Sequence, residues 1–213
     1  TGQATRRLIE LGADPLVAIE PDPALADYLT SVTGGQPDIR VAALEEVELP
    51  SASFDLAVAA SSFHWVDEEV GLTKLFDALR PSGWVALWWT LFGVDDEHDA
   101  FIAATSPLLE DLVPGPSHGE PGRPSYALDA EARLGALRAA GFADASNETA
   151  RWTADWDTEG IRALYGTFSP ISRLDDKRRG EILDGVARVA RLDFGGRVER
   201  TLLTSLYTAR RPW

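Results

Sequence analysis

The segment Phe63-His64-Trp65 contains the side chain best suited to acid–base chemistry in this chain. It directly follows the apolar run Phe54–Ala60, so it lies where a buried strand is expected to end. The imidazole of His64 titrates near neutral pH and can act as a general base toward a hydroxyl, acid or amine. It can also position a ligand or make a structural hydrogen bond. The residue type leaves these three roles open.

A second candidate is Glu20, which ends the short apolar run of residues 16–19. In dinucleotide-binding folds, a carboxylate at the end of a strand accepts hydrogen bonds from ribose hydroxyls. The alternative is a solvated charge at the start of a loop. Asp22 is a good N-cap and Pro23 suits the first helical position, so this stretch is typical of a strand, a turn and a helix.

These candidates need elements that bring strand ends together. Continuous apolar runs predict strands buried on both faces, and apolar residues at helical spacing predict helices. We expect strands at 16–19, 39–44, 54–60, 84–89, 142–152 and 198–210, and helices at 4–12, 23–33, 67–80, 97–112, 129–141, 161–168 and 182–189. Breaks are expected at 80–83 and in the loop 114–126, which is rich in proline and glycine and can serve as a lid.

The alternation of strands and helices predicts βαβ units with parallel pairing and right-handed crossovers. The expected fold class is therefore α/β, with a Rossmann-like, doubly wound and mostly parallel sheet and helices on both faces. The length of 213 residues and the 45% hydrophobic content favour a single domain over residues 1–213.

Composition excludes several classes of function. Lys and Arg number 20 against 34 Asp and Glu, so the surface repels phosphate backbones and no nucleic-acid partner is expected. The absence of cysteine excludes disulfides and thiolate catalysis and permits a cytoplasmic location. Apolar runs fall short of the roughly 20 residues that span a bilayer, so no membrane partner is expected. No cluster of histidines and carboxylates predicts a metal, and the oligomeric state stays open.

Five segments, taken in order, resemble the class I S-adenosylmethionine-dependent methyltransferase family, in particular trans-aconitate methyltransferase-like enzymes that act on small molecules. The segments are Thr1-Gly2-Gln3-Ala4-Thr5, Glu20-Pro21-Asp22-Pro23, Phe54-Asp55-Leu56, Phe63-His64-Trp65 and Leu79-Arg80-Pro81-Ser82-Gly83. The resemblance implies a cofactor-binding half at 1–90 and a substrate-side part at 91–213. It also implies an antiparallel pair of strands at the C-terminal end.

The resemblance implies a binding site for S-adenosylmethionine made of Gly2, Gln3, Glu20, Pro21, Leu44, Glu45, Ala60, Ser61 and Phe63. Gly2 corresponds to the last glycine of the family's glycine loop, although a lone glycine is also typical of an ordinary turn before a helix. Ala43 stands where the family often has an aspartate that meets the adenine amino group. Glu45 can take over that contact, or it can be a solvated charge.

The function implied is transfer of a methyl group from S-adenosylmethionine to an oxygen, nitrogen or carbon of a small-molecule acceptor, with His64 as the candidate catalytic residue. Two alternatives stay open, a nicotinamide-dependent Rossmann oxidoreductase and a non-catalytic module that keeps the fold. The chain begins within the expected glycine loop and contains no methionine. We therefore expect upstream residues that supply a helix, the earlier glycines and a first strand between those ending at Glu20 and Ala60.

Overall fold

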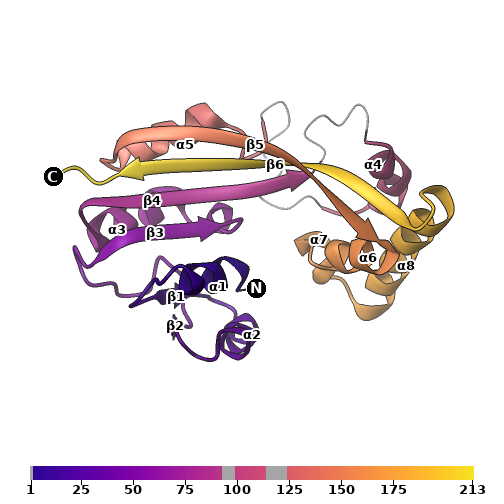
Figure 1. Ribbon diagram of the computed structural model, residues 1–213, viewed down its shortest axis with the longest axis horizontal. Coiled ribbons are helices and arrows are strands. Elements are labelled where there is room, and N and C mark those ends of the chain that lie inside the picture. Colours follow the sequence, from indigo (N-terminus) through magenta and orange to yellow (C-terminus); the bar gives the residue numbers. More distant parts are fainter. Residues whose placement is uncertain (1, 93–98, 114–123) are drawn as a thin grey trace. The chain divides into compact units, whose positions relative to one another are not determined.

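A computed structural model describes residues 2–92, 99–113 and 124–213 of the chain (Figure 1). The predicted lid at 114–126 lies mostly outside these residues, as do His98 and His118. The helices are α1 (Gln3–Glu10), α2 (Pro23–Thr33), η1 (Phe63–Trp65), α3 (Glu68–Ala78), α4 (Ala100–Thr105), η3 (Ser106–Leu108), α5 (Ala130–Ala139), α6 (Thr158–Gly166), α7 (Ser169–Ser172) and α8 (Asp176–Asp193). The strands are β1 (Val17–Ile19), β2 (Asp38–Arg40), β3 (Phe54–Ala60), β4 (Leu79–Phe92), β5 (Ala143–Asp157) and β6 (Arg197–Arg210).

The strands form two sheets. β1 and β2 pair in parallel, with Val17 opposite Asp38 and Ile19 opposite Arg40. The other sheet has the order β3-β4-β6-β5, and its arrows show β6 running against β4 and β5 on either side (Figure 1). The predicted α/β class, with helices on both sides and an antiparallel C-terminal strand pair, is confirmed. The sheet that was expected to be mostly parallel is mixed, because β6 runs against both of its neighbours.

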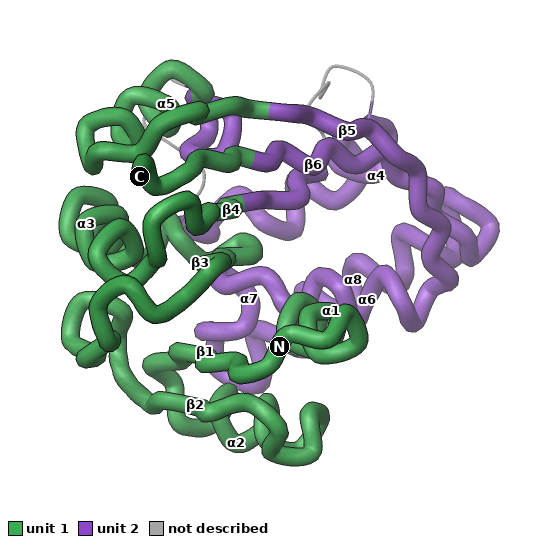
Figure 2. Tube along the Cα trace, turned by 60° about the vertical axis from the view of Figure 1, so that its left-hand side comes forward, with its two compact units in different colours: residues 1–87, 130–147, 207–213 green, residues 88–129, 148–206 purple. Residues whose placement is uncertain are grey.

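The chain divides into two compact units, shown in different colours in Figure 2. Unit 1 consists of residues 1–87, 130–147 and 207–213, and unit 2 of residues 88–129 and 148–206. Strands β4, β5 and β6 each contribute residues to both units. No helix among the described residues is long and apolar enough to cross a membrane.

The helices of unit 1 begin where the sequence predicts them. The Asp22 carboxylate accepts hydrogen bonds from the backbone N–H groups of Ala24 and Leu25, at 2.8 and 3.3 Å, and Gly34 ends α2 with a positive φ of 63°. The Asp67 carboxylate accepts from the N–H of Val70 at 3.1 Å. These acceptors satisfy N–H groups that have no partner within the first turn of a helix.

The helix that was expected to break at residues 80–83 ends at Ala78, but the next strand begins at Leu79 and not at the predicted residue 84. The N–H of Ser82 donates to the Arg211 carbonyl at 2.9 Å, and the N–H of Arg211 donates to the Gly83 carbonyl at 2.8 Å. Pairing with the C-terminal end of the chain thus extends the strand. A Cβ at Gly83 would lie 2.9 Å from the Arg80 carbonyl oxygen, so glycine permits this close backbone approach.

Three other predicted boundaries are corrected by local contacts. β2 ends at Arg40 rather than at 44, because the N–H groups of Glu46 and Val47 donate to the Ala43 carbonyl and close a turn. The helix predicted at 97–112 is α4 followed by a short 3₁₀ turn that contains Pro107. β5 continues beyond 152 to Asp157, whose carboxylate caps α6.

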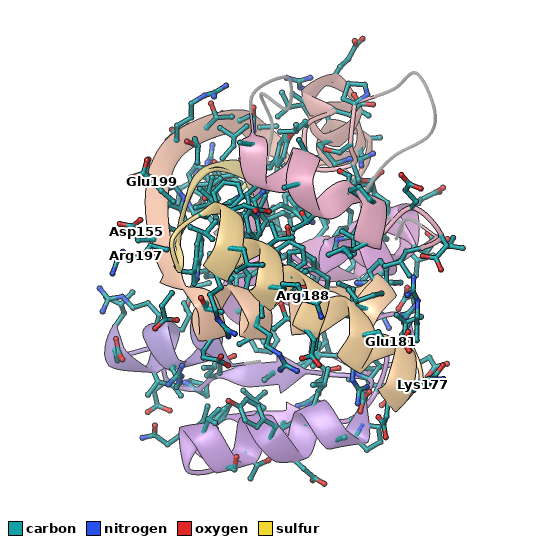
Figure 3. All side chains as sticks on the ribbon, turned by 90° about the vertical axis from the view of Figure 1, so that its right-hand side faces the viewer. Asp155, Lys177, Glu181, Arg188, Arg197 and Glu199 are labelled. Carbon is teal, nitrogen blue, oxygen red and sulfur yellow. The ribbon has the colours of Figure 1, made fainter. Side chains whose placement is uncertain are left out.

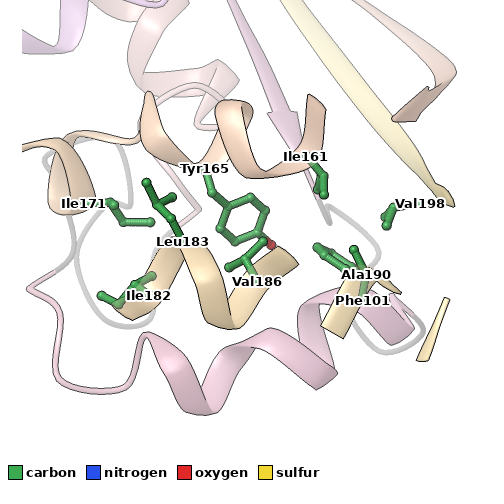
Figure 4. Close-up of a cluster of buried hydrophobic side chains, with 9 residues drawn as sticks. All are labelled: Phe101, Ile161, Tyr165, Ile171, Ile182, Leu183, Val186, Ala190 and Val198. Atoms are coloured by element: carbon green, nitrogen blue, oxygen red, sulfur yellow. The ribbon is translucent and has the colours of Figure 1, made fainter. Parts of the chain in front are cut away.

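Unit 2 has a hydrophobic core built mainly by α6 and α8 (Figure 4). Its buried members are Phe101, Ile161, Tyr165, Ile171, Ile182, Leu183, Val186, Ala190 and Val198. Beside it, the side chain of Arg200 is 2% exposed and donates to the Asp99 carboxylate at 2.8 Å. Asp99 also accepts from the N–H groups of Phe101 and Ile102 at the start of α4. One carboxylate therefore joins a helix start to a buried cation.

Candidate active site

The loops that follow β1, β2 and β3 meet at one edge of unit 1. Because β1 and β2 are parallel, the residues after each strand lie at the same end of the pair. The turn at 43–47 follows β2, and within it the Glu45 carboxylate accepts a hydrogen bond from the N–H of Asp67 at 2.8 Å. Asp67 belongs to the segment that follows β3. This edge is where open α/β sheets bind their ligands.

Glu20 lies at this edge, half-buried, directly after β1. Its N–H donates to the Arg40 carbonyl at 3.1 Å, and its Oε1 atom accepts from the N–H of Asp22 at 3.0 Å. Among the described residues, no group donates a hydrogen bond to its second carboxylate oxygen, Oε2. Glu20 therefore has a fixed backbone, one oriented oxygen and one oxygen available to hydroxyl groups. Pro21 follows it and is exposed.

Glu45 holds the edge together from within the chain. In addition to the bond from Asp67, its backbone carbonyl accepts from the Lys74 ammonium at 2.6 Å, and the same ammonium donates to the Val47 carbonyl at 2.8 Å. Leu44 is half-buried in the same turn. Sequence reasoning missed Lys74, because a lysine in mid-helix shows no sign of which distant carbonyls it will reach.

The segment after β3 has an unusual backbone. Ser61 is exposed and has a φ of 50°, in the left-handed region that serine rarely adopts, immediately after Ala60 ends the strand. Phe63 is 1% exposed, and a Cβ on Gly71 of α3 would lie 3.0 Å from its ring. The Phe63 side chain is thus part of the core, so only its backbone can face a ligand.

His64 is half-buried beside Trp65, with their ring centroids 5.3 Å apart and their planes at 42°. Burial lowers the pKa of His64 below its ordinary value of 6.5, because the charged imidazolium is less well solvated there. At neutral pH the ring is therefore neutral, which is the form that can accept a proton. Trp65 leaves 47% of its surface exposed at the same place.

Gly2 precedes α1 and has a φ of 76°. A Cβ there would lie 2.9 Å from the Val32 side chain and 3.0 Å from that of Leu29, so both the backbone and the space require glycine. Its carbonyl accepts from the N–H of Arg6 at 2.9 Å, and Gln3 begins the helix with an exposed side chain. In Figure 1 this end of α1 lies on the side toward which the β3 arrow points.

Within the ranges that the structure describes, no group of three or more histidines and carboxylates is placed to hold a metal.

The predicted site residues divide into two groups. Glu20, Leu44 and Glu45 are joined to the segment after β3 by strand pairing and by the bond from Asp67. Gly2 and Gln3 are held instead by α1 and its contact with α2.

Comparison with known proteins identifies the kind of domain that contains this edge. Residues 1–87, which contain all the predicted site residues, match the sequence model of a family described as Methyltransferase domain. Residues 1–87 carry a methyltransferase domain. This finding decides against the nicotinamide-dependent oxidoreductase that the sequence left open. The cofactor of the methyltransferase is S-adenosylmethionine.

Relatives of the methyltransferase support this assignment. An uncharacterized methyltransferase of Schizosaccharomyces pombe is 24% identical over 213 residues, covering 98% of this chain and 79% of the relative. An uncharacterized methyltransferase of Mycobacterium tuberculosis is 35% identical over 89 residues, covering 42% of this chain but only 36% of that protein. Phosphoethanolamine N-methyltransferase 2 of Haemonchus contortus, solved with phosphomonomethylethanolamine and S-adenosylhomocysteine, has a TM-score of 0.56 at 13% identity. That match covers 100% of this chain and 47% of the other, and it shows the shared fold.

Proposed function

We propose that the methyltransferase transfers a methyl group from S-adenosylmethionine to an oxygen, nitrogen or carbon of a small molecule at the edge that follows β1, β2 and β3. The observation that carries this proposal is Glu20, whose carboxylate has one oxygen fixed by Asp22 and one oxygen without a donor among the described residues. Such a carboxylate at the end of a strand is suited to two ribose hydroxyls.

Several contacts of the predicted site residues support the proposed cofactor site. Glu20 binds the ribose, and Pro21 and Leu44 cover the adenine. Gly2 and Gln3 offer backbone N–H groups at the start of α1, where the helix dipole carries positive charge. Ala60, Ser61 and the Phe63 backbone receive the amino group of the methionine part. Glu45 is already bonded to Asp67 through one oxygen, so we propose that it shapes the adenine pocket and offers only its other oxygen.

His64 is proposed to orient the acceptor. The bound cofactor supplies a sulfonium methyl group that is already electrophilic, so alignment of the acceptor atom, the methyl carbon and the sulfur provides much of the rate. The neutral imidazole can hold an acceptor proton by accepting a hydrogen bond, and Trp65 offers an aromatic face beside it. With the cofactor bound, the acceptor would displace the sulfur at the methyl carbon, and the acceptor proton would pass to His64 or to solvent.

We also propose a division of the chain, a subgroup and a cellular location for the methyltransferase. The division into a cofactor half at 1–90 and a substrate side at 91–213 agrees with the position of the family match at 1–87, but it does not coincide with the two compact units. Membership of the trans-aconitate methyltransferase-like subgroup rests on the five sequence segments alone. A cytoplasmic location likewise stays a prediction.

We also propose that another strand lies between β1 and β3 and is supplied from the N-terminal side of Thr1. Within the described residues, β1 pairs with β2 and β3 pairs with β4, and the two sheets share no ladder. In Figures 1 and 2, β1 lies on the β3 side of β2. Leu56 of β3 is 48% exposed. Unpaired backbone and exposed leucine at an inner edge are costly, which supports a missing neighbour.

Hydrogen exchange tests the additional strand. In a chain extended upstream of Thr1, the amides of β1 and β3 should exchange more slowly than in the chain of residues 1–213, because the added strand satisfies their free edges. The amides of α8, which lies in unit 2, serve as the internal control. Equal exchange of β1 and β3 in the two chains would contradict the proposal.

The function itself is tested by incubating the extended protein with S-adenosylmethionine carrying a labelled methyl group and a panel of small acids, alcohols and amines. We expect one chemical class to become labelled while S-adenosylhomocysteine accumulates in equal amount. If the protein binds S-adenosylhomocysteine but labels nothing while its His64→Gln variant behaves identically, the acceptor part of the proposal is wrong and a non-catalytic role is favoured.

A further inference from the structure

One face of α8 is charged and packs beside α6. The apolar residues of α8 point into the core of unit 2, as Figure 4 shows for Ile182, Leu183 and Val186. A different set repeats at the i, i+3, i+4, i+7 spacing of a single helix face, namely Asp184, Ala187, Arg188 and Arg191. The helix therefore presents one stripe to the core and a second, polar stripe to its neighbour.

This polar stripe and α6 enclose a groove of about 270 Å³. Glu159 and Arg162 line it from α6, and Asp184, Ala187, Arg188 and Arg191 line it from α8. Ala187, which is 7% exposed, is the apolar residue of this lining. Figure 3 views unit 2 from the side of α8 and labels Arg188 at the middle of the helix, with Glu181 and Lys177 toward its start.

Of the three arginines that line the groove, one forms an ion pair and two do not, among the residues that the structure describes. Arg162 donates to the Asp184 carboxylate at 2.9 and 3.3 Å, so those two charges compensate each other. Arg188 and Arg191 are exposed, and neither has a hydrogen-bond or ion-pair partner in the part of the chain that the structure describes. The chain carries 34 carboxylates against 20 basic side chains. Arg188 and Arg191 are therefore two cations on one face of α8 that no carboxylate pairs with in the described part of this acidic chain.

We propose that this groove binds a compact anion carrying two or more negative charges, such as a phosphate ester or a polycarboxylate. Guanidinium groups present planar pairs of N–H donors that match phosphate and carboxylate oxygens. Arg188 and Arg191 lie three residues apart and so on neighbouring turns of α8, which allows both to reach one anion. Arg162 donates to Asp184 through Nε and Nη2, which leaves its Nη1 group as a further hydrogen-bond donor from α6. The site does not depend on the proposed methyl-transfer site, because every residue that lines it belongs to unit 2.

Calorimetry with pyrophosphate and with citrate tests this site at an ionic strength of about 10 mM, where screening is weak. We expect both probes to bind the unaltered protein and the Arg188→Gln/Arg191→Gln variant to bind them at least about tenfold more weakly. Glu159→Gln should bind more tightly, because it removes a negative charge from the groove. Binding of only one probe would assign the site to phosphates or to carboxylates.

The matched control is Lys177→Gln/Arg197→Gln, which removes the same charge from unit 2 outside the groove. It should leave the affinity for both probes within about twofold of the unaltered protein. Equal weakening in the control and in the groove variant, or no binding of either probe to the unaltered protein, would overturn the proposal. So would a groove variant that melts at a lower temperature but binds unchanged, because Arg191 would then serve only the C-terminal end of α8. Titration with S-adenosylhomocysteine on the same samples reports separately on the methyltransferase site.

Discussion

The two compact units of the methyltransferase differ in how they use polar groups. Unit 1 holds its carboxylates at the ends of strands, where Glu20 and Glu45 bond backbone N–H groups and leave oxygens toward solvent. Unit 2 buries a polar pair, Arg200 with Asp99, beside a continuous hydrophobic core. The contact between Arg200 and Asp99 therefore contributes chiefly to stability. The carboxylates at the edge of unit 1 are available to bind a ligand, because a carboxylate that faces solvent can exchange its partners with little loss of folding stability.

The largest effect is expected when the buried pair of unit 2 is broken. Asp99→Ala leaves the Arg200 cation buried without its partner and removes the cap of α4, so the free energy of unfolding should fall by about 3–5 kcal/mol. Urea denaturation of the variant and the unaltered protein measures this loss of unfolding free energy. The control is Asp111→Ala, which removes an exposed partner of Arg178 and should cost less than about 1 kcal/mol. Equal costs for the two variants would remove the contrast between buried and exposed pairs.

A smaller but functional effect is expected at the edge of unit 1. Glu20→Gln keeps an oxygen for the Asp22 N–H and replaces the second carboxylate oxygen by an amide donor. A hydrogen bond to a charged group contributes about 1.5–3 kcal/mol, so affinity for S-adenosylhomocysteine should fall about ten- to hundredfold. Calorimetry on the extended protein measures it, with Glu10→Gln on α1 as the control. Unchanged affinity in Glu20→Gln would remove the ribose contact from the proposed site.

The cap of α2 contributes less. Asp22→Ala deletes the acceptor for two N–H groups at the start of the helix and should lower the free energy of unfolding by about 1 kcal/mol. The exposed Asp27 of the same helix provides the control, since Asp27→Ala removes a charge without removing a cap. If both variants lose the same stability, the cap is not what holds this end of α2.

The smallest effect concerns the pH dependence of stability through His64. Burial lowers its pKa in the folded state, so the unfolded chain binds protons more readily. The contribution of the neutral imidazole is complete above the ordinary pKa of 6.5 and is lost as pH falls through the lower folded value. His64→Gln should flatten this part of the stability profile between neutral and acidic pH. An unchanged slope in the variant would show that another group is responsible.

Local signals in the sequence predicted much of this architecture. Asp22 and Asp67 cap their helices as expected, and β3 has its predicted bounds of Phe54–Ala60. The helix caps are formed by residues within three positions of each other, so spacing alone reveals them. The extent of β4 was not predictable in this way, because residues 79–83 become a strand only when Arg211 pairs with them from the far end of the chain.

The sequence allowed the candidate residues to be named, but it did not reveal which groups they contact. Glu20 and His64 were identified from their positions after apolar runs, and the structure places each beyond the strand expected. The roles of Glu45 and Lys74 depend on partners 22 to 29 positions away, which no local pattern contains. Phe63 was expected to face the cofactor, yet its ring is buried against α3. The side that an aromatic residue faces at a strand end is decided by packing.

Hydrogen exchange of the extended protein with and without S-adenosylhomocysteine tests the central claim most directly. We predict slower exchange in the presence of the ligand at three stretches of unit 1, residues 20–23, 43–47 and 60–65, and no change in α6 and α8 of unit 2. Protection confined to unit 2, or none at these three loops despite saturating ligand, would contradict the assignment of the cofactor to the edge that follows β1, β2 and β3.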